Sequence, residues 1–317
     1  MSIDHHSPPV GLALCLGLLL VGPSHGQDAV PGEAEKSAPS FTAGADGFSL
    51  RSAQGDFVLR LRGYLNSDGR AFVDDGDRSS TDTFTIRRAR PILEGTLFGK
   101  FDFRLMPDFG GGTTTLQDAY VEVRVSPKFR VRSGKFKVPV GLERLQSVTD
   151  SVFVERALPT ALVPNRDLGI QLGGEVLGGR LEYAVGLFDG VVDGGSSDAD
   201  VTDAKEVAGR VFVRPFRQAD NSVSPFDLGV GLAVSVGDEE GSIASTALPS
   251  YRTVGQQSFF SYRSDATAAG TVFADGERTR VSPQGYLYVG PFGVVVEAVR
   301  SEQVVRRATV ATDLATD

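Results

Sequence analysis

The sequence has very few of the residues on which most catalytic and metal sites depend. Its 317 residues include one cysteine, three histidines and no tryptophan. Cys15, His5, His6 and His25 all lie within the first 26 residues. A chain that loses this segment on export would contain no thiol and no imidazole, which excludes a disulfide framework, a Ser-His-Asp or cysteine nucleophile and an ordinary zinc site. We therefore predict neither an enzyme nor a bound cofactor.

Long hydrophobic runs are also scarce. The one strongly apolar run, at 11–22, is shorter than the roughly 20 residues that a membrane-spanning helix needs. Small residues at Ser24 and Gly26 precede a possible cleavage position, which is typical of a secretory signal peptide. We predict a signal peptide at 1–26, followed by a mobile linker rich in proline, alanine and glutamate at 27–47.

The charge balance narrows the possible partners. A formal net charge of −8 argues against nucleic acid, which requires a basic surface. The same net charge is compatible with a locally basic channel, because the field depends on where the charges lie. The export signal and the missing thiols fit the envelope of a Gram-negative bacterium.

Alternation with a period of two dominates the central part of the sequence. From 89 to 101 every odd position is apolar or small, whereas most of the even positions carry polar or charged residues such as Arg90 and Glu94. The segment 57–65 has the same pattern, with Arg60 and Arg62 on its polar face. This periodicity predicts extended strands with one apolar and one ionic face. The parity reverses after Gly134, and we expect a β-bulge there to restore a common face.

Strands of this kind recur at intervals of roughly 10 residues, which is typical of an outer-membrane barrel. The pattern predicts an all-β fold, an antiparallel transmembrane β-barrel over 48–317 with roughly 12 to 14 strands. The segment 141–167 does not alternate and is long for a connection. It is either a surface excursion or a loop folded into the lumen, and its place between two strong strands favours the lumen. The final residues lack a terminal aromatic strand, so we expect a C-terminally incomplete chain or closure with another segment.

Four short motifs occur in the first two thirds of the sequence. They are Phe-Thr-Ile-Arg-Arg-Ala-Arg at 84–90, Gly-Lys-Phe-Lys-Val-Pro-Val-Gly at 134–141, Glu155-Arg156, and Asn-Arg-Asp-Leu-Gly at 165–169. In their order and spacing they resemble the phosphate-selective porin O and P family over about 48–190 of this sequence. The resemblance implies roughly 16-stranded, trimeric barrels of the outer membrane that pass anions along an arginine ladder and past lysines at a constriction. It assigns Arg87, Arg88 and Arg90 to the ladder, and Lys135 and Lys137 to strands near the pore. The segment 143–166 contains no lysine, so the resemblance supports no lysine-based phosphate site in that loop.

Two functions remain open at this point. The first is an outer-membrane porin, a homotrimer in contact with membrane lipid, in which small anions such as phosphate diffuse through an arginine-lined channel. Its candidate anion-binding residues are Arg60, Arg62, Arg87, Arg88, Arg90, Lys135 and Lys137. The second is a non-conducting outer-membrane or periplasmic β-structure that anchors or recognises another component. For Arg60, Arg62, Arg88 and Arg90 a structural alternative also stays open, in which they pair with Glu94, Asp118 and Glu122 and only fill the wall.

Overall fold

The computed structural model describes residues 38–73, 81–151, 153, 155–199, 202–218, 225–253, 255–307 and 310–314. The predicted signal peptide at 1–26 lies outside the described residues, as does the predicted linker up to residue 37. Within the described ranges, no helix has the length and the apolar character needed to cross a membrane.

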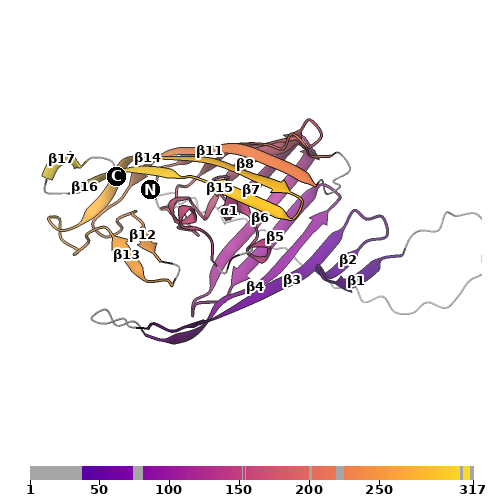
Figure 1. Cartoon of the computed structure of the whole chain (residues 1–317), viewed down its shortest axis with the longest axis horizontal. Helices are drawn as coiled ribbons and strands as arrows, with labels where there is room; N and C mark the ends of the chain where they lie inside the picture. The colour runs from indigo at the N-terminus through magenta and orange to yellow at the C-terminus, as the bar shows by residue number, and fades with distance from the viewer. Residues whose placement is uncertain are drawn as a thin grey trace, which may run out of the picture. The chain divides into compact units, whose positions relative to one another are not determined.

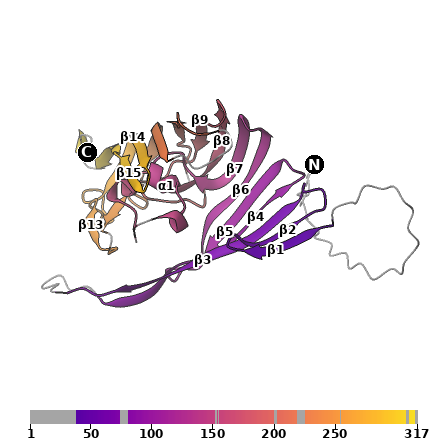
Figure 2. The same cartoon turned by 45° about the vertical axis from the view of Figure 1, so that its right-hand side comes forward.

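Strands account for most of the described secondary structure (Figures 1 and 2). The first seven are β1 (Ser40–Gly44), β2 (Gly47–Arg51), β3 (Val58–Arg70), β4 (Thr83–Leu97), β5 (Phe101–Asp108), β6 (Thr115–Ser126) and β7 (Phe129–Lys137). Three short helical turns follow, α1 (Leu142–Leu145), η2 (Val148–Asp150) and η3 (Leu158–Leu162). The remaining strands are β8 (Arg166–Val176), β9 (Leu181–Phe188), β10 (Glu206–Val213), β11 (Phe226–Glu240), β12 (Ser250–Arg252), β13 (Ser258–Ser261), β14 (Val272–Val289), β15 (Phe292–Glu297), β16 (Arg300–Arg307) and β17 (Val310–Leu314).

Fifteen of the described strands form one sheet in which every pairing is antiparallel. The strand order follows the sequence from β1 to β11 and continues through β14 and β16 to β17, while β15 pairs with β14. Strands β12 and β13 form a separate hairpin. The predicted all-β, antiparallel fold is confirmed. The count of 12 to 14 strands was too low because short strands such as β1 and β2 carry little pattern of their own.

The sheet begins at Ser40, inside the segment that the sequence predicts to be a linker. Ser40–Gly44 pairs residue by residue with Gly47–Arg51, and β2 in turn pairs with β3. Gly47 adopts a φ of 91°, a left-handed conformation that glycine reaches easily, so the chain can reverse sharply before β2. The hairpin therefore extends the sheet upstream of residue 48.

One face of the sheet exposes its large apolar side chains. In β3, Leu59, Leu61 and Leu65 are 41%, 49% and 66% exposed. In the middle of the sheet, Val211 of β10 lies directly opposite Leu232 of β11, and both side chains are exposed. A continuous exposed apolar face is unusual in a water-soluble protein and is what a barrel presents to lipid. The odd-numbered apolar residues of β3 to β6 lie on this face, as their alternation predicts.

The opposite face carries charged residues that are buried within the protein. Asp118 and Glu122 of β6, Arg210 of β10, and Arg278 and Arg280 of β14 are all among the least accessible side chains. Each of them takes part in an ion pair. Buried charges require such partners, because an isolated charge removed from water is strongly destabilising. The sheet is thus apolar on its exposed face and ionic on its covered face.

The bulge that we predicted at Gly134 is absent. Residues 133 to 135 of β7 keep an unshifted register with both β6 and β8, so the prediction was wrong. Gly134 instead adopts a φ of 124°, a conformation open mainly to glycine. Because the register is unshifted, Phe136 lies on the same face as Arg130 and Arg132 and lines the same cavity, as does Lys137 at the end of β7.

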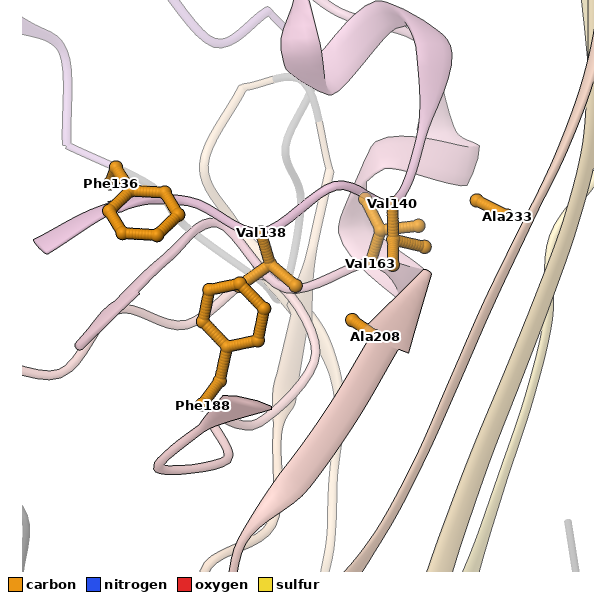
Figure 3. Packing of buried hydrophobic residues seen from close by; sticks show 7 residues of the cluster. All are labelled: Phe136, Val138, Val140, Val163, Phe188, Ala208 and Ala233. Carbon is orange, nitrogen blue, oxygen red and sulfur yellow. The ribbon is translucent and has the colours of Figure 1, made fainter. Parts of the chain in front are cut away.

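A small apolar cluster lies where the long segment after β7 meets the ionic face of the sheet (Figure 3). Val138 and Val140, which follow β7, pack with Val163, Phe188 and the small side chains Ala208 and Ala233. The ring centroids of Phe136 and Phe188 are 5.5 Å apart in an edge-to-face arrangement. These contacts bury both ends of the 141–165 segment and so fix its position relative to strands β7 to β11.

Candidate functional site

A cavity of about 690 Å³ lies between the ionic face of the sheet and the segment that follows β7. Even-numbered residues of β3 to β6, such as Arg62, Arg90 and Arg104, form part of its wall. Leu142, Leu145 and 146–150 close it from the side of the segment. The period-two pattern of the sequence thus separates cavity-lining from exposed positions in these strands.

Positive charge predominates in the lining of this cavity. Among the described residues it contains nine Lys or Arg side chains and five Asp or Glu side chains, a formal excess of four positive charges. The cations are Arg62, Arg90, Arg104, Arg130, Arg132, Lys137, Arg156, Arg166 and Arg210. The anions are Asp118, Glu122, Asp150, Glu175 and Glu182. The chain as a whole carries a net charge of −8, so the formal charge of the lining is opposite in sign to that of the chain. Glu94 and Asp108, which pair with lining arginines without lining the cavity themselves, offset part of it.

Most arginines on the strands are paired with carboxylates. Glu94 accepts hydrogen bonds from both Arg62 and Arg104, at 2.9 Å each. Arg132 lies 2.7 Å from Glu122, and its guanidinium stacks 4.4 Å from the ring centroid of Tyr120. The wall pairing expected for Arg62 is therefore present, and it reduces the positive charge that this arginine offers to an anion.

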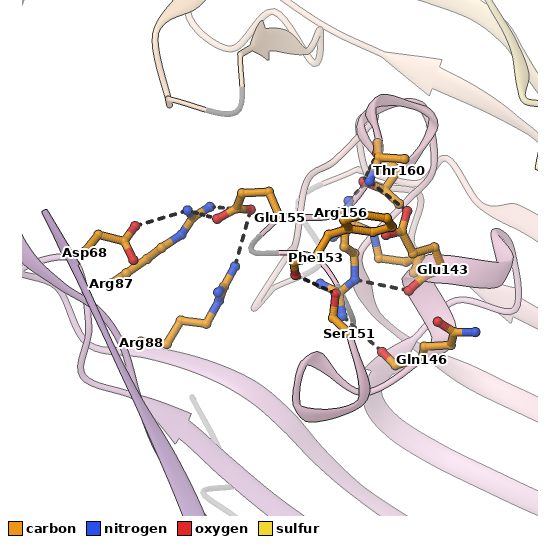
Figure 4. Close-up of polar contacts among 12 residues, drawn as sticks. Asp68, Arg87, Arg88, Glu143, Gln146, Ser151, Phe153, Glu155, Arg156 and Thr160 are labelled. Carbon is orange, nitrogen blue, oxygen red and sulfur yellow. Dashed lines mark hydrogen bonds and ion pairs between the residues drawn. The ribbon is translucent and has the colours of Figure 1, made fainter. Parts of the chain in front are cut away.

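The predicted residues Arg87 and Arg88 converge on one carboxylate of the long segment (Figure 4). Arg87 donates from Nη2 to Glu155 at 3.0 Å and also contacts Asp68 at 3.3 Å, while Arg88 lies 3.9 Å from Glu155. In a regular strand two consecutive side chains point to opposite faces. Here the register of β4 against β3 shifts, with Arg88 opposite Asn66 and Ile86 opposite Ser67, so Arg87 is the extra residue of a bulge.

The other predicted residues are distributed over different environments. Arg90 donates to Asp108 at 2.6 Å and to the hydroxyl of Tyr64 at 2.7 Å. Arg60 lines a second cavity of about 490 Å³ together with Arg51 and Arg124. Lys135 is buried in an ion pair with Asp198 and does not line the larger cavity. Arg62, Arg90 and Lys137 are thus the predicted residues that meet in the larger cavity.

Lys137 and Arg156 are held by backbone carbonyl groups rather than by carboxylates. Lys137 donates from Nζ to the carbonyl oxygens of Leu145 and Gln146, at 3.1 and 2.7 Å. Arg156 donates to the carbonyl oxygens of Glu143 and Gln146, at 3.1 and 3.0 Å (Figure 4). A carbonyl oxygen carries only a partial charge, so these contacts orient the two side chains without supplying a full counter-charge.

Two arginines of this segment, Arg144 and Arg156, lie near other cations. Burial, together with the charges of Arg156 and Arg166, lowers the pKa of Arg144 to about 10. Burial and the charge of Arg88 also lower the pKa of Arg156. A guanidinium with a pKa of about 10 remains protonated at neutral pH. The segment contributes one cation, Arg156, and one anion, Asp150, to the lining of the cavity.

Several lining residues were not among the predicted site residues. Arg104, Arg132 and Arg210 occupy the polar positions of their strands, so the signal that identified Arg62 and Arg90 also applied to them. Arg156 and Arg166 could not be found in this way, because the segment around them has no periodicity. Their place in the lining depends on contacts across the fold, such as the 2.7 Å bond from Arg166 to Asp118.

The sequence was compared with known proteins. A family model described as phosphate-selective porin O and P matches residues 57–314, which is most of the chain. No curated protein matches the sequence.

Proposed function

Because the chain belongs to the phosphate-selective porin O and P family, we propose that small anions such as phosphate diffuse passively through it along an arginine-lined channel. Membership of the family implies an outer-membrane location in a Gram-negative bacterium. The family is one of channels rather than of enzymes. The antiparallel sheet is accordingly the wall of a transmembrane β-barrel.

The observation that carries the proposal is the excess of positive charge in a cavity of an acidic protein. An anion that leaves water loses hydration energy, and fixed cations on the wall compensate for part of that loss. Guanidinium groups suit phosphate in particular, because they stay charged and donate two parallel hydrogen bonds to its oxygens.

The segment 141–165 sets the width of the proposed channel. Two bonds tie it to the far side of the sheet, where Glu297 of β15 accepts the backbone N–H groups of Leu142 and Glu143 at 3.0 and 3.1 Å. Glu155 ties it to β4 through Arg87. A segment anchored to β15, β7 and β4 narrows the space between these strands and carries Arg156 to the narrow point.

Single-channel recording in a planar bilayer tests the proposal. We expect stepwise current in KCl that decreases when phosphate is added, because phosphate would occupy the cationic site for longer than chloride does. Current that phosphate leaves unchanged would be consistent with a porin but would contradict phosphate as a preferred solute. The absence of current from folded, inserted protein would contradict the proposal and favour the non-conducting alternative.

The homotrimer implied by the family remains part of this proposal. The exposed apolar face of the sheet offers a surface for lipid and for other copies of the chain. Crosslinking of the protein in outer-membrane fragments would yield a trimer, whereas a monomer alone would contradict this part of the proposal.

A further inference from the structure

We propose that Arg280 is a positioning residue for the channel constriction, acting through a second loop, 189–198, that braces the long segment 141–165. The contacts that form this brace do not depend on the proposed function, whereas their effect on the channel rests on it. Arg278 and Arg280 do not line the 690 Å³ cavity, so any effect on the channel is transmitted through other residues.

The first step is the attachment of the second loop to the wall. Arg280 of β14 is fully buried and donates from Nε to Asp193 at 2.6 Å and from Nη2 to the carbonyl oxygen of Val191 at 2.7 Å. Its Nη1 lies 2.7 Å from Glu206 of β10. One guanidinium therefore joins the second loop to two strands of the sheet, in the forked geometry that arginine provides.

Arg278 adds a second attachment on the same strand. It donates to the carbonyl oxygen of Val191 at 3.0 Å and pairs with Glu239 of β11 at 2.7 Å. Two arginines thus share three carboxylates in a buried network, and Asp193 is the member that belongs to the loop. Buried networks of this kind hold a single arrangement, because any departure leaves an unpaired charge away from water.

The second step is the contact between the two loops. Gly194 donates its N–H to the carbonyl oxygen of Val163 at 2.9 Å, Asn165 donates to Gly195 at 3.0 Å, and Ser197 donates to Arg166 at 3.2 Å. Arg166 and Ser196 form a parallel β-bridge. The second loop therefore lies against 163–166, where the long segment returns to β8, as an added short strand would.

The third step leads from this contact to the cavity. Val163 is completely buried in the apolar cluster, and Arg166 both lines the cavity and binds Asp118 at 2.7 Å. The backbone position of both residues is set by their bonds to the second loop. Release of Asp193 from Arg280 would leave the carbonyl of Val191 as the attachment of the loop to β14, so that 193–197 and the return of the constricting segment would loosen.

Hydrogen exchange tests the brace without relying on conduction. We expect the wild-type protein to be protected in peptides covering 160–168 and 190–198, and the Asp193→Ala variant to lose this amide protection. Arg280→Gln would show the same loss and Arg280→Lys a smaller one. Since Arg280→Gln could fail to fold, Asp193→Ala on the loop carries the test, because it leaves the pair of Arg280 with Glu206 intact.

Two control variants make the result specific. Asp275→Ala removes an exposed ion pair, to Arg306, on the same strand as Arg280. Tyr251→Phe removes only the hydroxyl that donates to Asp193 at 3.2 Å. Both should retain wild-type protection at 160–168. Unchanged protection in Asp193→Ala, or equal loss in either control, would overturn the proposal.

Bilayer recording then measures the consequence for the channel. We expect Asp193→Ala channels to show additional conductance sublevels while keeping the wild-type ion preference, because no cavity-lining charge changes. Cation-selective or absent current in wild-type protein would contradict the proposed function, and the exchange experiment would still decide the role of Arg280. A single stable conductance level in Asp193→Ala that matches wild type would contradict the link from the second loop to the constriction.

Discussion

At the scale of single residues, the kind of partner that holds a cation decides what the cation can do. Arg62 and Arg104 share the carboxylate of Glu94, which offsets much of their charge. Lys137 and Arg156 bind carbonyl oxygens, which supply no full counter-charge. Arg156, the cation that the long segment contributes to the lining, should therefore influence a passing anion more than an arginine of the wall that is paired with a carboxylate.

The Arg156→Gln variant tests this difference. We expect the ratio of anion to cation permeability to fall by up to about fivefold, since two unit charges about 4 Å apart in water interact by about 1 kcal/mol. The measurement is the reversal potential under a KCl gradient. Arg306→Gln, on an exposed pair outside the cavity, serves as the control and should match wild type. An equal shift in both variants would show that total charge, not the position of Arg156, is responsible.

The Glu122→Gln variant should raise the ratio of anion to cation permeability. Glu122 is one of the five acidic residues of the lining and pairs with Arg132 at 2.7 Å. Glutamine preserves the size and an acceptor oxygen while removing the negative charge, so Arg132 gains effective positive charge. A lower anion preference in this variant would contradict the assignment of the cavity to the ion path.

At the scale of elements, aromatic rings on the ionic face of the sheet pack over glycines of the neighbouring strand. Phe212 of β10 lies directly opposite Gly231 of β11, and a Cβ added to Gly231 would collide with the ring of Phe212. The ring also stacks on Tyr286, with centroids 5.8 Å apart. The run of small residues that backs the apolar face of β11 therefore provides space for aromatic rings from neighbouring strands.

We expect Gly231→Ala to lower the free energy of unfolding by about 1–3 kcal/mol, the usual cost of overpacking. Thermal unfolding followed by circular dichroism in detergent measures it. Gly209→Ala is the matched control, because a Cβ at Gly209 would meet nothing closer than the carbonyl oxygen of Ala184 at 3.7 Å. Equal stability of the two variants would show that Phe212 can move aside.

The sequence predicts features that lie within one strand but not those that depend on contacts between strands. The face on which Leu61 or Arg62 lies follows from alternation within one strand, so the sheet and much of the cavity wall could be predicted from the sequence. The bulge at Arg87 and the twist at Gly134 depend on pairing with other strands. The bonds from α1 to Glu297 join residues more than 150 positions apart, which no local pattern encodes.

At the scale of the whole molecule, the distribution of charge matters more than its sum. The chain carries −8 overall, yet the described lining of the cavity has four more cations than anions. Salt screens such fields over a Debye length of about 10 Å at 0.1 M and about 3 Å at 1 M. Positive charges that act across a cavity are therefore sensitive to ionic strength.

We accordingly expect the ratio of anion to cation permeability to decrease as KCl is raised from 0.1 M to 1 M at a constant gradient. Reversal potentials at several concentrations measure this dependence. Selectivity that does not change with salt would instead indicate direct coordination of a dehydrated ion at a narrow site.

The reversal potential of the wild-type channel under a KCl gradient is the most direct test of the central claim. The account predicts a potential of the sign given by chloride as the more permeant ion, because the cavity presents an excess of positive charge. A potential of the sign given by potassium would contradict the claim that these arginines and Lys137 line an anion path.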